Sequence, residues 1–195
     1  MNLYKLRSKI HINEINNLHS FSVFGDLKND QDTYIFDNDP RNANIGLKLI
    51  HSKKNPRILN GINEINEEKY HEILIQNLVP LSHYDLEENK SLLLENNFEN
   101  LNSISWDKGC YVGQEITARM KYRALLKKKI YSLVIKDGSA IVGQLIKDNE
   151  SEFGKIISIK NNFVLAMLKI ELADKKLITK KQIETNEGLI LEFIL

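Results

Sequence analysis

The sequence of 195 residues is poor in cysteine, proline, glycine and aromatic residues, with one Cys, three Pro, nine Gly and 8% aromatic side chains. A single cysteine excludes a disulfide within the chain and is typical of a reducing compartment. No apolar run approaches the roughly 18 residues of a membrane span, and the N-terminus lacks a signal-peptide core. These absences predict a soluble, cytoplasmic protein with no membrane partner.

Charge of one sign is also lacking, because 27 Lys and Arg residues face 26 Asp and Glu residues. A net charge of +1 gives no global attraction to nucleic acid or to anionic lipid. The five histidines show no metal-ligand spacing, and none is an evident base for the cysteine. They are His11, His19, His51, His71 and His83. The sequence therefore predicts no metal bound directly by this chain.

The first two thirds of the chain predict short strands, one helix and a long irregular connection. We expect a helix over residues 62–78, capped by Asn63 and stopped by Pro80. Residues 81–105 are polar and rich in asparagine, as long functional loops often are. Strands are expected at 10–15, 21–24, 32–36 and 45–50.

After Lys129 the sequence becomes a series of β-rich runs separated by turn dipeptides such as Asp137-Gly138. The runs cover residues 130–135, 140–146, 153–159, 163–170 and 188–195, with a sixth strand expected at 177–183. Their spacing predicts a small antiparallel β-barrel. We therefore expect an α+β chain with two domains, residues 1–127 and residues 128–195.

The chemistry-bearing motif is WDKGCYVGQE, residues 106–115, which holds both the only cysteine and the only tryptophan. Gly109 and Gly113 would permit backbone angles closed to other residues and a close approach of a ligand. If a helix running to about Leu126 begins here, Cys110 lies near its positive end, where Lys108 would also favour the thiolate. The alternative is that the cysteine is a small buried apolar residue.

The stretch from Arg119 to Lys129 holds six cationic side chains. One interpretation is a solvated helix end, where basic residues complement the helix dipole and Arg119 pairs with Glu115. The other is an anion site for a polyanionic small molecule or an RNA backbone. Downstream of the motif, the four-residue spacing of Ile116 and Met120 predicts an apolar stripe on the helix.

The run K-G-C-Y-V-G-Q-E at residues 108–115, followed by Ala118-Arg119, resembles the K-G-C-Y-x-G-Q-E-x-x-A-R signature of YgfZ-type proteins. These folate-binding proteins are related to the aminomethyltransferase of the glycine cleavage system, and they support iron–sulfur cluster assembly or repair. Asp39-Pro40-Arg41 and Ile104 to Asp107 resemble further family segments. The resemblance implies a GcvT/YgfZ-like folate-binding domain followed by the barrel.

The resemblance also implies a tetrahydrofolate cavity beside Cys110, which would be the reactive residue. It implies iron–sulfur assembly proteins or client enzymes as partners, with a link to tRNA modification. A tetrahydrofolate-dependent aminomethyl transferase and a non-catalytic RNA- or protein-binding module remain alternatives. The expected folate-binding residues are Glu95, Asn97, Lys108, Gly109, Tyr111, Gly113, Gln114, Glu115 and Arg119.

The chain departs from the family pattern in three places, one of which is Ala124, where relatives carry a glycine after the residue that matches Arg123. Relatives carry some 80 or more residues before the point that matches Met1, so we expect a partial folate-binding domain, from a truncated, split or degenerate copy. The family motif R-I-x-x-G-x-P reads Leu74-Ile-Gln-Asn-Leu-Val-Pro80 here and lacks both its arginine and its glycine.

Overall fold

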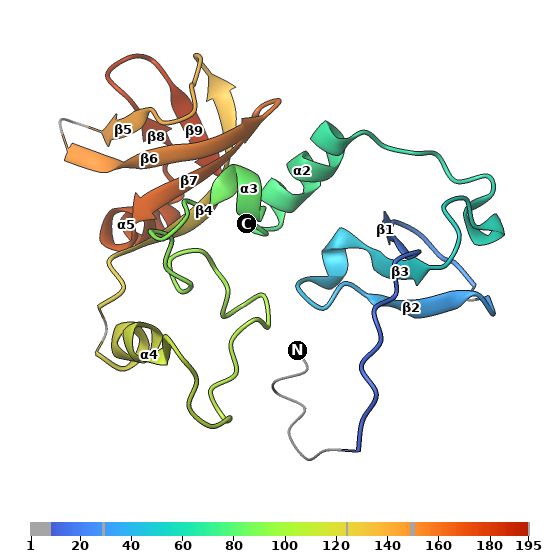
Figure 1. Cartoon of the computed structure of the whole chain (residues 1–195). Coiled ribbons are helices and arrows are strands. Elements are labelled where there is room, and N and C mark those ends of the chain that lie inside the picture. The colour runs from blue at the N-terminus through green and yellow to red at the C-terminus, as the bar shows by residue number, and fades with distance from the viewer. Residues whose placement is uncertain (1–8, 29, 124, 149–150, 195) are drawn as a thin grey trace. The chain divides into compact units, whose positions relative to one another are not determined.

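The computed structural model describes residues 9–28, 30–123, 125–148 and 151–194 (Figure 1). These residues form two compact units. The first runs up to residue 39 and includes 46–63, and the second joins 40–45 to everything from residue 64 onward. The boundary expected between residues 127 and 128 falls inside the second unit and stays a prediction about the family's domains. No helix in the described part is long and apolar enough to cross a membrane.

The first unit is a three-stranded antiparallel sheet of β1 (His19–Val23), β3 (Leu47–His51) and β2 (Thr33–Asn38), in that order. Gly46 precedes β3 with φ +89°, and a Cβ there would lie 2.4 Å from the carbonyl oxygen of Val23. No other residue fits that approach. The strand expected at 10–15 is wrong: this segment pairs with no strand, and its isoleucines are exposed.

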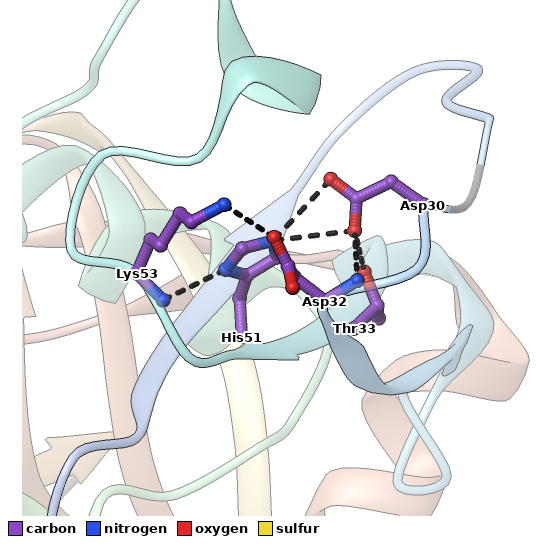
Figure 2. A network of polar contacts seen from close by, with 5 residues as sticks. All are labelled: Asp30, Asp32, Thr33, His51 and Lys53. Atoms are coloured by element: carbon purple, nitrogen blue, oxygen red, sulfur yellow. Dashed lines mark hydrogen bonds and ion pairs between the residues drawn. The ribbon is translucent and has the colours of Figure 1, made fainter.

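A polar network closes one end of this sheet around the buried side chain of His51 (Figure 2). His51 Nδ1 accepts the N–H of Lys53 at 2.8 Å, so Nε2 carries the proton and lies 3.2 Å from Asp30 Oδ1. Hydrogen bonds from Thr33, His51 and the N–H of Asp32 lower the pKa of Asp30 against partial desolvation. Lys53 also pairs with Asp32. Both ring nitrogens of His51 are occupied, which makes it a structural residue and not a general base.

The second unit begins with helix α2, Glu67–Gln76. Asn66 caps it, because its Oδ1 accepts the N–H of Lys69 at 2.8 Å. The expected cap at Asn63 is wrong for that reason: the first free N–H groups of the helix lie beyond its reach. The irregular connection predicted over residues 81–105 is interrupted by the short helix α3, Ser82–Asp85, and residues 86–105 are turn and loop, as predicted.

The end of α2 explains one departure from the family motif. Leu78 adopts φ +54°, Val79 N–H bonds the carbonyl of Leu74 at 2.9 Å, and Leu78 N–H bonds that of Ile75 at 3.1 Å. This is the Schellman arrangement, whose left-handed residue is usually glycine. The family motif carries its glycine two residues before the proline, which is position 78. Leucine there costs about 1–2 kcal/mol of backbone strain.

The last third is a nearly closed six-strand antiparallel barrel with the order β5-β6-β7-β4-β9-β8 (Figure 1). Its strands are β4 (Lys128–Asp137), β5 (Leu145–Asp148), β6 (Ser151–Lys160), β7 (Phe163–Lys169), β8 (Ile183–Glu184) and β9 (Ile190–Phe193). Side-chain contacts join the two edges, since Gln144 Nε2 donates to Glu187 at 3.1 Å and Lys176 pairs with Asp148 at 2.5 Å. Apolar residues that alternate along the strands, such as Leu133 and Ile156, fill its core.

Two predicted strands of the barrel are largely wrong. Of the strand expected at 140–146, only Leu145 and Ile146 lie in β5, and Ile141 and Val142 are exposed. Of the strand expected at 177–183, residues 177–179 belong to α5, Ile170–Thr179, and only Ile183 pairs in the sheet. The segment favours a helix because Glu171 pairs with Lys175 one turn later at 2.9 Å, and Ala173 packs into the core. Lys180 ends the helix in the left-handed conformation with φ +52°.

Helix α2 packs on the barrel. Ile75 joins Ile130 and Leu165 in one buried cluster. Glu72, 6% exposed at its side chain, accepts a hydrogen bond from Asn161 Nδ2 in the β6–β7 turn at 2.6 Å. Hydrogen bonds from Lys69 and Asn161 lower the pKa of Glu72, although desolvation opposes them. The barrel and α2 therefore share both an apolar and a polar contact.

Candidate functional site

The signature residues form a loop that leads into helix α4, Gln114–Tyr122. Gln114 closes the turn before the helix, because its Oε1 accepts the N–H of Tyr111 at 3.1 Å. The ammonium of Lys108 lies over the ring of Tyr111, 4.7 Å from its centroid. Lys108, Tyr111 and Gln114 thus make local contacts that shape the loop around Cys110.

Cys110 is exposed, which rules out the alternative of a buried apolar residue. It precedes the first residue of α4 by four positions. The helix begins within the motif, as expected, but Cys110 lies outside its first turn, where the dipole acts, so the expected effect of the helix end on the thiol stays a prediction. The side chain of Val112, two residues on, is fully exposed as well. The thiol is therefore exposed because of the backbone conformation of the loop, and not because of its position relative to the start of α4.

The two glycines that flank Cys110 have different backbones. Gly113 has φ +88°, a conformation that L side chains rarely adopt, and it precedes α4 as the cap residue. Gly109 is outside the left-handed region, and a Cβ there would meet nothing within 4 Å. The expected conformational need is confirmed for Gly113 and wrong for Gly109. A close approach of a ligand at Gly109 stays a prediction.

Helix α4 buries few side chains. Thr117 and Met120 are buried, but Ile116 is 59% exposed, so the predicted apolar stripe is only partly formed. The helix ends at Tyr122 and not near Leu126. The predicted pair is confirmed, with Arg119 donating to Glu115 at 2.6 Å. Both partners are exposed, which limits what the pair adds to stability.

Glu99, which the sequence did not single out, contacts both ends of the signature segment. Its Oε1 accepts the indole N–H of Trp106 at 3.0 Å and also pairs with Lys121 of α4. The ammonium of Lys121 lies 5.4 Å from the ring centroid of Trp106. Trp106 in turn meets Tyr122 edge to face at 5.9 Å. We name Glu99, Trp106, Lys121 and Tyr122 the Glu99 cluster.

Two of the expected folate ligands make contacts within the fold. Asn97 adopts φ +66°, donates to the carbonyl of Leu78 at 2.9 Å and accepts from Asn100 at 2.7 Å. Its amide thus holds the end of α2. The buried Glu95 accepts the N–H of Ile130 through its carbonyl at 2.8 Å, and its carboxylate lies 3.5 Å from Lys128.

A groove of about 530 Å³ lies between the 84–96 segment and the barrel. Ile157 and Met167 contribute apolar surface, and Glu95 lines it together with Lys155 and Lys169. No ion pair is recorded for either lysine within the described residues. A second cleft of about 480 Å³, between α5 and β8, is polar. Neither cleft is lined by residues 108–115, so a cavity beside Cys110 stays a prediction.

The basic stretch of residues 119–129 is largely engaged with the fold. Besides the pairs of Arg119, Lys121 and Lys128 described above, the ammonium of Lys129 lies 5.0 Å from the ring centroid of Tyr131. Arg123 and Lys127 are exposed. Because α4 ends at Tyr122, the interpretation as a solvated helix end fits Arg119 and Lys121, whereas Lys128 and Lys129 belong to β4. RNA binding through residues 119–129 stays a prediction.

The sequence also did not predict a buried pair formed by His71 and Asp85. His71 Nε2 lies 3.2 Å from Asp85 Oδ2, which accepts the N–H of Leu81 at 2.6 Å. Fourteen residues separate the pair, a spacing that no sequence pattern marks. In the described part of the chain, no three His, Cys, Asp or Glu side chains form a group that could hold a metal ion.

Comparison with known proteins gives two kinds of relative. The mouse protein named iron–sulfur cluster assembly factor IBA57, mitochondrial, is 26% identical over 146 residues, which covers 70% of this chain and 41% of that protein. The human protein of the same name is 32% identical over 99 residues, or 51% of this chain and 28% of the relative.

The second kind is bacterial. The tRNA-modifying protein YgfZ of Pectobacterium atrosepticum is 44% identical over 59 residues, or 30% of this chain and 17% of the relative. No family model matches the sequence. The matched regions thus span less than half the length of each of these relatives. The chain is a homologue of the iron–sulfur cluster assembly factors named IBA57 and of the tRNA-modifying proteins named YgfZ, which are members of the YgfZ/GcvT-like folate-binding family.

Proposed function

We propose that this chain is an accessory factor of iron–sulfur cluster assembly or repair, with Cys110 as its functional residue. The observation that carries the proposal is the exposed thiol at the centre of the signature loop, in a chain whose relatives are named as iron–sulfur cluster assembly factors. An exposed thiol on a loop that also exposes Val112 fully is open to a macromolecular partner.

The chemistry of the thiol limits how it acts. Iron–sulfur clusters are held by several cysteine thiolates, commonly four, and this chain has one cysteine. Cys110 therefore does not hold a cluster alone. It acts on a cluster, as substrate, whose other ligands belong to a partner, or it reacts with a partner's sulfur. Both routes fit a solvent-facing loop better than a closed active site.

Tetrahydrofolate is the proposed ligand, and the groove lined by Glu95 is the site whose residues fit it. A carboxylate such as Glu95 accepts hydrogen bonds from the amino and ring N–H groups of a pterin. The apolar surface of Ile157 and Met167 suits the aromatic part of the ligand, and Lys155 and Lys169 suit its carboxylates. The volume of about 530 Å³ is in the range of small-molecule sites.

Replacement of Cys110 tests the main proposal. We expect Cys110→Ala and Cys110→Ser to abolish the chain's support of iron–sulfur enzymes in cells that lack their own homologue. The melting temperature should not change, because the side chain is exposed. Val112→Ala, in the same loop and equally exposed, is the matched control. Full enzyme activities with Cys110→Ala would overturn the proposal.

Titration with tetrahydrofolate tests the ligand, with Trp106 fluorescence and calorimetry as readouts. We expect saturable binding that Glu95→Gln and the double change Lys155→Gln/Lys169→Gln weaken, whereas Lys175→Gln on α5 leaves it unchanged. No saturable signal at millimolar ligand would remove folate from the proposal. Binding together with one-carbon transfer that survives Cys110→Ala would favour the aminomethyl transferase instead.

A further inference from the structure

The Cys110 loop and α4 together span residues 106–122, and the Glu99 cluster lies at the base of this segment. Trp106 precedes the cysteine by four residues, and Lys121 follows it by eleven. Both contact one carboxylate oxygen, Glu99 Oε1. The carboxylate therefore links the two ends of the segment.

The other polar contacts recorded for this segment, within the described residues, are local. Gln114 bonds the backbone of Tyr111, Lys108 lies over the same tyrosine, and Arg119 pairs with Glu115. Such contacts set the shape of the loop and the helix but do not tie them to the rest of the unit. That role falls to the buried Thr117 and Met120 and to Glu99.

The chemistry of the cluster calls for a carboxylate. The indole N–H is a donor only, and the ammonium is a cation with donors only, so a single residue that satisfies both must accept twice and carry negative charge. The ring of Trp106 adds its own attraction for the Lys121 ammonium. An amide at position 99 would keep the hydrogen bond but lose the ion pair.

We propose that Glu99 is the positioning residue of the Cys110 loop. Its carboxylate holds Trp106 and Lys121 together, and this fixes the direction in which Cys110 is presented to its partner. The inference rests on the proposed function for its consequence in cells, but the positioning itself is a property of the free chain. Because Glu99 is 34% and Lys121 41% exposed at the side chain, the effect is local and global stability changes little.

The test uses Glu99→Ala, Glu99→Gln and Glu99→Asp in the full chain. Glu171→Gln, which removes an exposed pair on α5, is the matched control. The first readout is acrylamide quenching of Trp106, the only tryptophan. The second is the rate of Cys110 alkylation by iodoacetamide, where the only cysteine gives the whole signal. The third is iron–sulfur enzyme activity in cells.

We expect Glu99→Ala to raise Trp106 quenching and to change the alkylation rate by about fivefold, the factor that one lost hydrogen bond represents. Support of iron–sulfur enzymes should fall about tenfold, as misplacement of a reacting group does. Glu99→Asp should retain part of the wild-type quenching, alkylation rate and enzyme support. In all three readouts Glu99→Gln should lie between Glu99→Ala and Glu99→Asp, and Glu171→Gln should match the wild type. The melting temperatures of all four should stay close together.

Wild-type quenching and alkylation in Glu99→Ala would overturn the inference, whatever the cells show. Changed quenching and alkylation with full cellular activity would also overturn it, provided that Cys110→Ala is inactive. If Cys110→Ala is itself active, the proposed function fails. In that case the two in vitro readouts still decide whether Glu99 positions the loop.

Discussion

The barrel with α2 and the signature loop with α4 belong to one compact unit but are held in different ways. The barrel buries a continuous core, and α2 adds a shared apolar cluster and the buried carboxylate of Glu72. Helix α4 buries only Thr117 and Met120, and the Glu99 cluster that ties it down is partly exposed. The segment with the clearest functional signature is thus the one that packing secures least, as is usual for segments that bind or react.

The largest effect is expected from a substitution that creates a cavity where α2 packs on the barrel. Leu165 in β7 is fully buried against Ile75 and Ile130. We expect Leu165→Ala to lower the free energy of unfolding by about 2–5 kcal/mol, measured by urea denaturation. Ile116→Ala on the exposed face of α4 should change it by less than about 0.5 kcal/mol. Similar losses for the two variants would break the comparison.

A middle-sized effect is expected from the buried carboxylate. Glu72→Gln removes the charge that Lys69 and Asn161 stabilise and should cost about 1–3 kcal/mol at neutral pH. The lowered pKa of Glu72 means that its contribution is present above the unfolded value of 4.5 and is lost as the pH falls through the folded value. Below that range, the variant and the wild type should converge in unfolding free energy.

The control for this effect is Glu171→Gln, since the pKa of Glu171 is also lowered by a lysine, Lys175, but the pair is solvent exposed. Its unfolding free energy should stay close to that of the wild type, because water screens an exposed pair. A gap between Glu72→Gln and the wild type that persists unchanged at pH 3 would show that the loss comes from shape and not from charge.

The sequence predicted those parts of the fold that depend on local pattern. Runs of apolar residues identified β4, β6, β7 and β9, and Pro80 marked the end of α2. The misses are apolar segments that resemble strands but do not pair as strands. The isoleucines at 10–15 alternate like a strand but find no neighbour to pair with. Residues 177–183 contain enough isoleucine and leucine to resemble a strand, but 177–179 continue the helix in which Glu171 pairs with Lys175.

The candidate site was predicted only where the motif itself carries the information. The position of Cys110, the pairing of Glu115 with Arg119 and the special backbone of Gly113 all follow from local sequence. Glu99 lies seven residues before Trp106 and 22 before Lys121, so no periodicity links the three. Its role depends on the tertiary fold, which brings Glu99 next to Trp106 and Lys121.

The smallest effect on unfolding free energy is expected for alanine substitutions at the two glycines of the loop. Gly113→Ala should cost about 1 kcal/mol in unfolding free energy, because alanine at φ +88° is strained. Gly109→Ala should leave stability unchanged, since its Cβ would point into open space.

If a ligand approaches the backbone at Gly109, the Gly109→Ala variant loses support of iron–sulfur enzymes while its urea midpoint stays that of the wild type. Equal stability losses for the two alanines would show that the loop's backbone differs from the one described. Full activity for Gly109→Ala would mean that no ligand uses the space beside this glycine, and that the demand for a special backbone next to Cys110 comes from Gly113 alone.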